Sequence, residues 1–350
     1  MAKTRSLLTI SFLMAAFASC GSALKKQMYV GTAVSVNHLT QDAMYKQLVD
    51  QHFSVITAEN EMKWGVTEKE RGKEQTKDAD TLNEYIIKTN KKLRAHTILA
   101  HTQNPDWIQG VNKEDMKTAA YTHMELIFKK YAKNMIAMDV CNEILDEGAL
   151  RQTIWLQTWG EEFVVDIFTK ARELAKMYNP DVLLFINDFS IEDKNAKSDK
   201  MLELATSLKK KGILDAVGFQ SHLEVGKFPT GFKENLQRFT DAGLLVALSE
   251  LDIRIKLQGR SESEIAQDRL QQTKDFEAAF EVCSSLEGCV GITLWGVSDQ
   301  YSWIQTNPGT TDAGEALMFD KDYKPKPAFD SLKAYFTPSN SKRVSRSRCA

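Results

Sequence analysis

The sequence predicts a single-domain α/β protein that folds as a (β/α)8 TIM barrel, and three observations lead to this fold. Short apolar runs that favour strands alternate with longer amphipathic runs that favour helices, a pattern typical of a parallel sheet. There are eight such apolar runs, which is the number that closes this barrel. Polar residues follow nearly every run, as expected where all strand ends converge on one face. An open doubly wound sheet is the alternative, although it would gather ligands at a single switch point.

The eight expected strands are short apolar runs bounded by polar or turn-forming residues. They span residues 28–33, 53–58, 92–98, 136–142, 182–187, 216–220, 244–250 and 290–295. The clearest helix between them spans residues 161–177, where apolar residues recur on one stripe and charged residues lie opposite. Pro180 ends this helix because proline cannot continue the backbone hydrogen bonding.

The composition of the 350 residues is that of an ordinary globular protein. Hydrophobic residues make up 43% and charged residues 26%, which excludes a collagen-like, disordered or multispan membrane chain. Lysine and arginine number 45 against 47 acidic residues, so the net charge of -2 provides no bulk attraction to nucleic acid. The sequence contains no His/Cys cluster with metal-ligand spacing and no phosphate-binding glycine loop. We therefore expect no metal, cofactor or nucleic-acid partner, and a neutral ligand fits.

The first 24 residues have the features of a secretory signal. Lys3 and Arg5 precede an apolar stretch at 7–17, and small residues follow it. Cys20 lies in a context that resembles a bacterial lipobox, in which the cysteine becomes the lipidated first residue of the mature chain. The alternative is an ordinary signal that is cleaved nearby. We expect an exported protein, either a lipoprotein of the bacterial cell envelope or a secreted or periplasmic protein.

The rest of the chain divides into a barrel at residues 25–337 and a tail at 338–350. The tail is polar and basic without apolar periodicity, so it is expected to be disordered. An exported protein passes into an oxidising compartment, and Cys283 and Cys289 are close enough in sequence to form a disulfide. Cys141 lies inside an apolar run and is expected to be a buried thiol.

Two carboxylates, Glu143 and Glu250, stand at the ends of strongly apolar strands. A carboxylate in such a position is unfavourable unless it has a partner or a function. Each could be one half of a structural ion pair, but two at equivalent positions beside Asn, His and Trp favour a functional site. Hydrolysis of a glycosidic bond needs two carboxyl groups: one protonates the leaving oxygen, and the other attacks or activates water. Aromatic rings and amides suit the apolar faces and hydroxyls of a sugar.

Seven short segments of the sequence match the motifs of a known family. Residues 57–64, 94–107, 139–143, 185–189, 217–223, 248–253 and 291–303 occur in the order of the motifs of glycoside hydrolase family 10. The chain resembles the endo-β-1,4-xylanases of this family over residues 28–337. The resemblance implies an enzyme whose substrate is xylan or xylo-oligosaccharide, and the chain is expected to act as a monomer.

The resemblance also implies a retaining double displacement, for which the two carboxyl groups should lie about 5–5.5 Å apart. Glu143 matches the general acid/base of the family and Glu250 matches its nucleophile. Asn142 would bind the 2-hydroxyl of the sugar in the −1 subsite. His222, supported by Asp252, would hold Glu250 ionised and oriented.

Other residues match the sugar-binding positions of the family. The residues that match sugar-binding positions are Glu59, Asn60 and Lys63 for the −2 subsite, His96, Gln103 and Gln220 for the −1 subsite and its support, and Trp295 and Trp303 for aromatic walls. Without the motifs, His96 or Trp303 could equally be a core residue and Lys63 a solvated charge.

Five other residues lie outside the family positions. His38, His52 and His123 belong to no motif, so they are given no functional role. Trp155 and Trp159 follow the fourth expected strand and could form sugar platforms on the aglycone side, but we favour a place in the core.

The chain departs from the family pattern at three positions. Ala95 replaces a glycine, Ala100 replaces a tryptophan that packs against the −1 site, and Phe189 stands where tyrosine is common. The loss of the tryptophan implies either a wider pocket or another ring that fills it. Two alternative functions stay open: a retaining glycosidase acting on another β-linked glycan, and a weakened glycan-binding protein.

Overall fold

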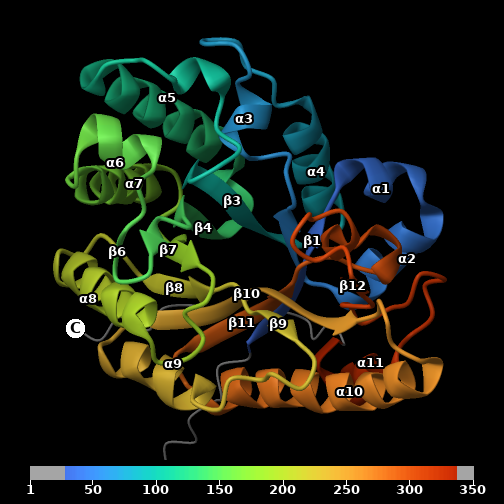
Figure 1. Ribbon diagram of the computed structural model, residues 1–350. Helices are drawn as coiled ribbons and strands as arrows, with labels where there is room; N and C mark the ends of the chain where they lie inside the picture. The colour runs from blue at the N-terminus through green and yellow to red at the C-terminus, as the bar shows by residue number, and fades with distance from the viewer. Residues whose placement is uncertain (1–27, 337–350) are drawn as a thin grey trace, which may run out of the picture.

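In the computed structural model, which describes residues 28–336, eight parallel strands close into a barrel (Figure 1). In order around the barrel they are β1 (Tyr29–Val34), β2 (Val55–Ala58), β3 (Lys92–Ala100), β4 (Met135–Asn142), β7 (Leu183–Asp188), β8 (Ala216–Phe219), β10 (Leu245–Lys256) and β11 (Cys289–Leu294). Strand β11 pairs with β10 on one side and with β1 on the other, so this sheet has no open edge. The predicted barrel is confirmed, and the open sheet is wrong.

The strand limits differ from the expected ones mainly at β10. The other seven strands differ by one or two residues at either end, whereas the strand expected at 244–250 continues to Lys256. The extension is stabilised by pairing with the short strands β9 (His222–Glu224) and β12 (Ala313–Gly314). Leu251, Ile253 and Ile255 continue an apolar alternation past Glu250, and this was the available signal for the longer strand.

Helices surround the barrel, and Figure 1 shows α10 along its lower side. The helices are α1 (Val36–Gln41), α2 (Ala43–His52), α3 (Trp64–Thr67), α4 (Lys77–Lys88), α5 (Lys113–Tyr131), α6 (Ile154–Trp159), α7 (Phe163–Tyr178), α8 (Ala196–Lys210), α9 (Phe232–Asp241), α10 (Glu262–Ser285) and α11 (Pro327–Leu332). Short 3-10 helices are η1 (Asp106–Ile108), η2 (Ala132–Asn134), η3 (Asp299–Tyr301), η4 (Trp303–Gln305) and η5 (Lys333–Phe336), and β5 (Leu145–Asp146) pairs with β6 (Ala149–Leu150). The helix predicted at 161–177 is α7, which ends at Tyr178 and is capped by Asn179, directly before Pro180.

The layer between the barrel and its helices is apolar. Trp155 and Trp159 are 0% and 1% exposed, which confirms the prediction that they belong to the core. His123 is buried as well and stacks on Trp64 with 4.7 Å between ring centroids. Burial lowers the pKa of His123 to about 3, so this imidazole is neutral and packs as an aromatic ring.

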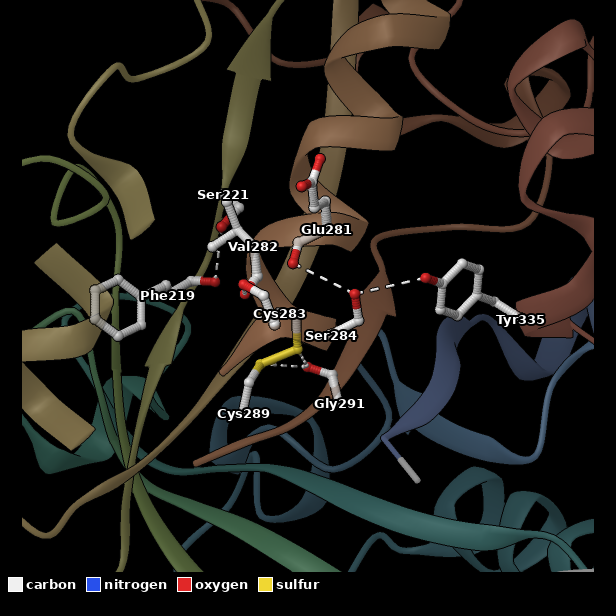
Figure 2. Close-up of a disulfide and its surroundings, with 10 residues drawn as sticks. Phe219, Ser221, Glu281, Val282, Cys283, Ser284, Cys289, Gly291 and Tyr335 are labelled. Atoms are coloured by element: carbon white, nitrogen blue, oxygen red, sulfur yellow. Dashed lines mark hydrogen bonds between the residues drawn. A yellow bond between two sulfur atoms is a disulfide. The ribbon is translucent and has the colours of Figure 1, made fainter. Parts of the chain in front are cut away.

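Cys283 and Cys289 form a disulfide between the end of α10 and the start of β11 (Figure 2). Their Cα atoms are 5.2 Å apart, within the range that a disulfide spans. Because β11 begins at Cys289, the bridge lies at the amino end of the barrel, away from the strand ends that carry the site. Cys141 is a buried free thiol, as expected.

The expected signal, Cys20 and the expected tail lie outside the described residues. Within residues 28–336, no helix has the length and apolar character needed to cross a membrane.

Candidate active site

The two carboxylates predicted from the sequence lie at the rim of the barrel, one directly after β4 and the other within the long strand β10. Glu143 directly follows β4, and its backbone nitrogen donates to the carbonyl of Asn187 at 2.8 Å. Its φ of 60° turns the chain sharply away from the strand. Glu250 lies within β10 and is 4% exposed, and its backbone nitrogen donates to the carbonyl of Gln220 at 3.0 Å. The turn after β4 and the continuation of β10 past the barrel therefore place the side chains of Glu143 and Glu250 at the same rim.

Glu143 has two polar partners, one that follows β3 and one that follows β8. Gln220 donates to Oε1 at 2.8 Å, and Nδ1 of His101 lies 2.6 Å from Oε2. Burial would raise the pKa of Glu143, but the contacts with His101 and Gln220 outweigh it and lower the pKa to about 2. In the free protein this carboxyl group is therefore ionised at neutral pH.

Glu250 has a different set of partners. Asn187 donates to Oε1 at 2.6 Å, and Nε2 of His222 lies 3.4 Å from Oε2. The other ring nitrogen of His222 lies 2.9 Å from Oδ2 of the buried Asp252. Burial would lower the pKa of His222, but Asp252 and Glu250 raise it to about 10, so the imidazole is cationic at neutral pH. Burial acts to raise the pKa of Glu250, yet His222 brings it below its usual value.

A buried amide network connects the two carboxylates. Asn187 donates both to Glu250 and, at 2.8 Å, to Oδ1 of Asn142. The hydroxyl of Ser249 donates to Oδ1 of Asn187 at 2.5 Å, so the amide orientation is determined by its neighbours. Gln220 reaches Glu143 from the next strand. The network holds both carboxyl groups in defined positions before any ligand binds.

The residues that match the −2 subsite form a polar group after β2. Lys63 donates to Oδ1 of Asn60 at 3.0 Å and to Oε1 of Gln103 at 2.7 Å, and Gln103 donates to Asn60 at 3.1 Å. The structure therefore brings Gln103 to the −2 group. Burial and the nearby charge of Glu61 raise the pKa of Glu59 to about 6. Lys63 supplies a cation and the amides supply donors and acceptors, which suits sugar hydroxyls.

Two tryptophans form aromatic walls near the nucleophile candidate. The indole nitrogen of Trp303 donates to Oδ2 of Asp252 at 2.7 Å, and its ring lies 4.8 Å from that of His222. Trp295 is 8% exposed and meets the ring of His96 edge-on at 5.3 Å.

His96 sits deeper, under these walls. It is 2% exposed, and its Nδ1 lies 2.8 Å from Oδ2 of Asp139. Asp139 also binds the fully buried Arg94 at 2.6 Å. The buried ion pair of Arg94 and Asp139 thus holds His96 in place, and His96 in turn supports Trp295.

Comparison with known proteins agrees with this geometry. A model of the family described as glycosyl hydrolase family 10 matches residues 19–335. The chain belongs to glycosyl hydrolase family 10. It is 33% identical over 311 residues to an endo-1,4-beta-xylanase of Agaricus bisporus, an alignment that covers 87% of this chain and 90% of that protein.

Solved family 10 structures also align over most of the chain. An endo-beta-1,4-xylanase from Gloeophyllum trabeum is 32% identical, with a TM-score of 0.80 over 89% of this chain and 97% of that chain. Xylanase 10B from Thermotoga petrophila, solved in complex with xylobiose, is 31% identical, with a TM-score of 0.82 over 89% and 94% of the two chains.

The family 10 departures have local structural consequences. Ala100 is 8% exposed, and the indole nitrogen of the core residue Trp155 donates to its carbonyl at 2.7 Å. The Ala100 side chain adds no aromatic surface to the cleft. The ring of Phe189 lies under the ammonium of Lys197, which is 3.6 Å from the ring centroid. A cation therefore covers the position where a tyrosine is common in family 10.

Sequence reasoning missed two residues that contact the carboxylates. His101 follows the end of β3 and was visible as a second histidine in the segment 94–107, but it was given no role. Asn187 ends an apolar run in the segment 185–189 and was likewise given none. Their position just after or at the end of a strand was the available signal. Among residues 28–336, no group of three or more His, Cys, Asp or Glu side chains is arranged to hold a metal ion.

Proposed function

We propose that this chain is a retaining endo-1,4-β-xylanase. The observation that carries the proposal is the pair Glu143 and Glu250, two carboxylates with different partners at one rim of a family 10 barrel. Relatives that align over most of the chain are named endo-1,4-beta-xylanases, and one related structure is a complex with xylobiose. The enzyme cleaves β-1,4-xylosidic bonds inside the polymer by double displacement.

Glu250 is the nucleophile. Its pKa is held below the usual value, so it is ionised and ready to attack the anomeric carbon. The cation of His222 orients it, and Asp252 and Trp303 hold His222 in turn. Attack breaks the bond to the leaving oxygen and forms a glycosyl-enzyme ester, which water then hydrolyses with retention of configuration.

Glu143 is the general acid in the first step and the general base in the second. It must carry a proton when the leaving oxygen departs, whereas the contacts in the free protein hold its pKa at about 2. A sugar that fills the cleft removes water from the carboxyl group, and desolvation favours the neutral form. In the second step Glu143 takes a proton from the attacking water.

The polar group after β2 supports binding of the glycone. Glu59, Asn60 and Lys63 offer acceptors and donors to the hydroxyls of a sugar in the −2 subsite. Asn142 is held by Asn187 next to Glu250, and it donates to the 2-hydroxyl in the −1 subsite. This hydrogen bond strengthens in the transition state.

Product analysis on soluble β-glycans tests the proposal. Xylan, mixed-linkage glucan and a mannan are incubated with the protein, and the anomeric configuration of each new reducing end is followed by NMR. We expect β-configured xylo-oligosaccharides from xylan. An α-configured first product would exclude retention, and release from another glycan alone would make the chain a different retaining glycosidase. Binding to xylan with no release would make it a glycan-binding protein.

We also propose that the chain is exported and lipidated at Cys20, and that it acts as a monomer. The signal-like start and the lipobox-like context of Cys20 support export and anchoring. The variant Cys20→Ala should move the protein from the membrane fraction to the soluble fraction, and unchanged fractionation would argue against the anchor. Light scattering of the protein without its first 24 residues should give the mass of one barrel.

A further inference from the structure

A second cavity lies on the same face of the barrel as the active site. It is lined by α1, by Asp42 and the first two residues of α2, and by Tyr301 of η3. Its volume is about 470 Å³, within the range of roughly 300–1,000 Å³ that ligand sites occupy. Helix α1 follows the carboxyl end of β1 and η3 follows that of β11, and these two strands are neighbours in the barrel. The cavity therefore opens at the catalytic rim.

This cavity adjoins the polar group proposed to bind the −2 sugar. The backbone nitrogen of Glu59 donates to the carbonyl of Val34 at 3.0 Å, and that of Val36, the first residue of α1, donates to Glu61 at 2.6 Å. These bonds join the start of α1 to the loop that carries Glu59 and Asn60. A glycan that extends beyond the −2 site can reach the cavity along this connection.

The cavity wall is aromatic and already ordered. The rings of His38 and Tyr301 stack in parallel, with centroids 3.7 Å apart. The hydroxyls of Tyr301 and Tyr323 both donate to Asp42, which also accepts from two backbone nitrogens at the start of α2. These contacts fix the Tyr301 ring before a ligand binds, which reduces the entropy lost on binding. Tyr301 is nevertheless 36% exposed.

The chemistry of the lining matches a neutral polyol. Met44 is 50% exposed and adds apolar surface beside the aromatic pair, while Asn37 and Gln41 bring exposed amides. No lysine or arginine lines this cavity. Asp42 is the ionised group in the lining, and its four donors occupy its acceptor sites. An acidic sugar would meet no cation here, whereas an unsubstituted sugar finds an apolar face and hydroxyl partners.

We propose that the cavity between α1 and η3 is a distal glycone subsite, in which Tyr301 and His38 bind the xylose unit beyond the −2 position. The inference rests on the proposed xylanase function and adds a site to it. It goes beyond the family motifs, because His38 lies in none of them and Tyr301, within the segment 291–303, matches no sugar-binding position named above. The proposal makes the enzyme prefer substrates with at least three glycone sugars.

Two aryl glycosides with the same leaving group test the subsite. 4-Nitrophenyl β-xylotrioside places one more sugar on the glycone side than the β-xylobioside, so the ratio of their kcat/KM values reports the third sugar alone. We expect a ratio above one in the wild type. The variants Tyr301→Ala and His38→Ala should reduce it by about five- to tenfold, the loss expected for an aromatic face. Tyr301→Phe retains the ring and its stacking on His38 but loses the hydrogen bond to Asp42, so it should reduce the ratio less than Tyr301→Ala.

A matched tyrosine provides the control. Tyr335 is 40% exposed and packs on Phe280 near the disulfide, at the other end of the barrel (Figure 2). Tyr335→Ala should leave both kcat/KM values unchanged. A wild-type ratio of one, or an equal fall on both substrates in Tyr301→Ala, would overturn the subsite.

If the wild type hydrolyses neither substrate, the proposed function is wrong. The subsite is then tested separately by measuring the binding of an oligosaccharide. Calorimetric titration with xylotetraose should then show a Kd that is raised about fivefold or more by Tyr301→Ala and is unaffected by Tyr335→Ala. Equal Kd values in the two variants would exclude a sugar site in this cavity.

Discussion

Nδ1 of His101 lies 2.6 Å from Oε2 of Glu143, and strand pairing is what places them together. Strands β3 and β4 are parallel, and their register pairs Ala100 with Asn142. His101 directly follows β3, and Glu143 directly follows β4. Glu143, the proposed general acid/base, therefore has an imidazole neighbour that comes from the barrel register.

Replacing His101 should change the pH dependence of catalysis. The contact with His101 is the strongest of those that lower the pKa of Glu143, so His101→Ala should raise that pKa. Glu143 in the complex with substrate then stays protonated to higher pH, and the alkaline limb of kcat on xylo-oligosaccharides should move upward by about one pH unit. A pH profile of kcat measures this, because kcat reports the pKa of the acid in the complex. Movement of the limb to lower pH would show that His101 does not control the acid.

Variants of the two glutamates proposed to be catalytic should respond differently to the leaving group of the substrate. Glu250→Ala should abolish hydrolysis of every substrate, because no glycosyl-enzyme can form. Glu143→Ala should lower kcat/KM on xylan by about 10²–10⁴-fold but should retain the first step on aryl xylosides with good leaving groups, which need little protonation. Steady-state and burst kinetics measure both effects. Replacing the exposed Glu203 on α8 by alanine gives a control that should leave both activities unchanged. Equal losses on xylan and on the aryl xylosides in Glu143→Ala would contradict the role of Glu143 as the acid.

His222 should make folding stability fall at alkaline pH. Its pKa is about 10 in the folded protein against 6.5 in the unfolded chain. Between these values the folded state holds a proton that the unfolded state has released. The stabilisation is therefore complete below pH 6.5 and is lost as the pH rises through about 10.

Denaturant unfolding at several pH values tests this linkage. The free energy of unfolding should decline between pH 6.5 and 10 more steeply in the wild type than in His222→Gln. Other groups titrate in both proteins, so their contributions cancel in the comparison. Equal slopes would mean that Asp252 and Glu250 do not hold the proton on His222.

The disulfide should stabilise the fold without contributing to catalysis. Replacing Cys283 and Cys289 together by alanine should lower the free energy of unfolding by about 2–3 kcal/mol, since the bridge closes a short loop in the unfolded chain. Because the bridge lies at the amino end of β11, kcat at 25 °C should be unchanged. Cys141→Ala controls for the loss of a buried sulfur atom, and denaturant unfolding compares the three proteins. A loss in the double variant no larger than in this control would contradict a role for the bridge.

Local pattern was sufficient to predict the barrel and its two carboxylates. The eight strands were found because a buried parallel strand must be a short apolar run, and this is visible in the sequence. Glu143 and Glu250 could be recognised because burying a carboxylate at the end of such a run is unfavourable unless the group has a partner or a function. The expected strand at 244–250 was too short, although Leu251, Ile253 and Ile255 continue an apolar alternation to the end of β10. Pairing with β9 and β12 holds this extension in place.

The partners of the site residues were harder to predict. His101 and Asn187 each stand beside a strand end, but sequence position does not say which side chain they meet. Gln103 was expected at the −1 subsite or among its supporting residues, and its hydrogen bonds to Lys63 and Asn60 could not be predicted from sequence. Its backbone has a φ of 58°. A left-handed residue outside glycine is rarely visible in sequence.

The sequence by itself determined the strand and helix order, the family and the two carboxylates, because apolar periodicity and short motifs are properties of neighbouring residues. Only the tertiary structure decided which groups meet: His101 with Glu143, Trp303 with Asp252, and His38 with Tyr301. The physical reason is barrel closure, which pairs strands in one register and brings residues that are distant in sequence to a common rim. That register determines the charges around each carboxylate, and so its pKa.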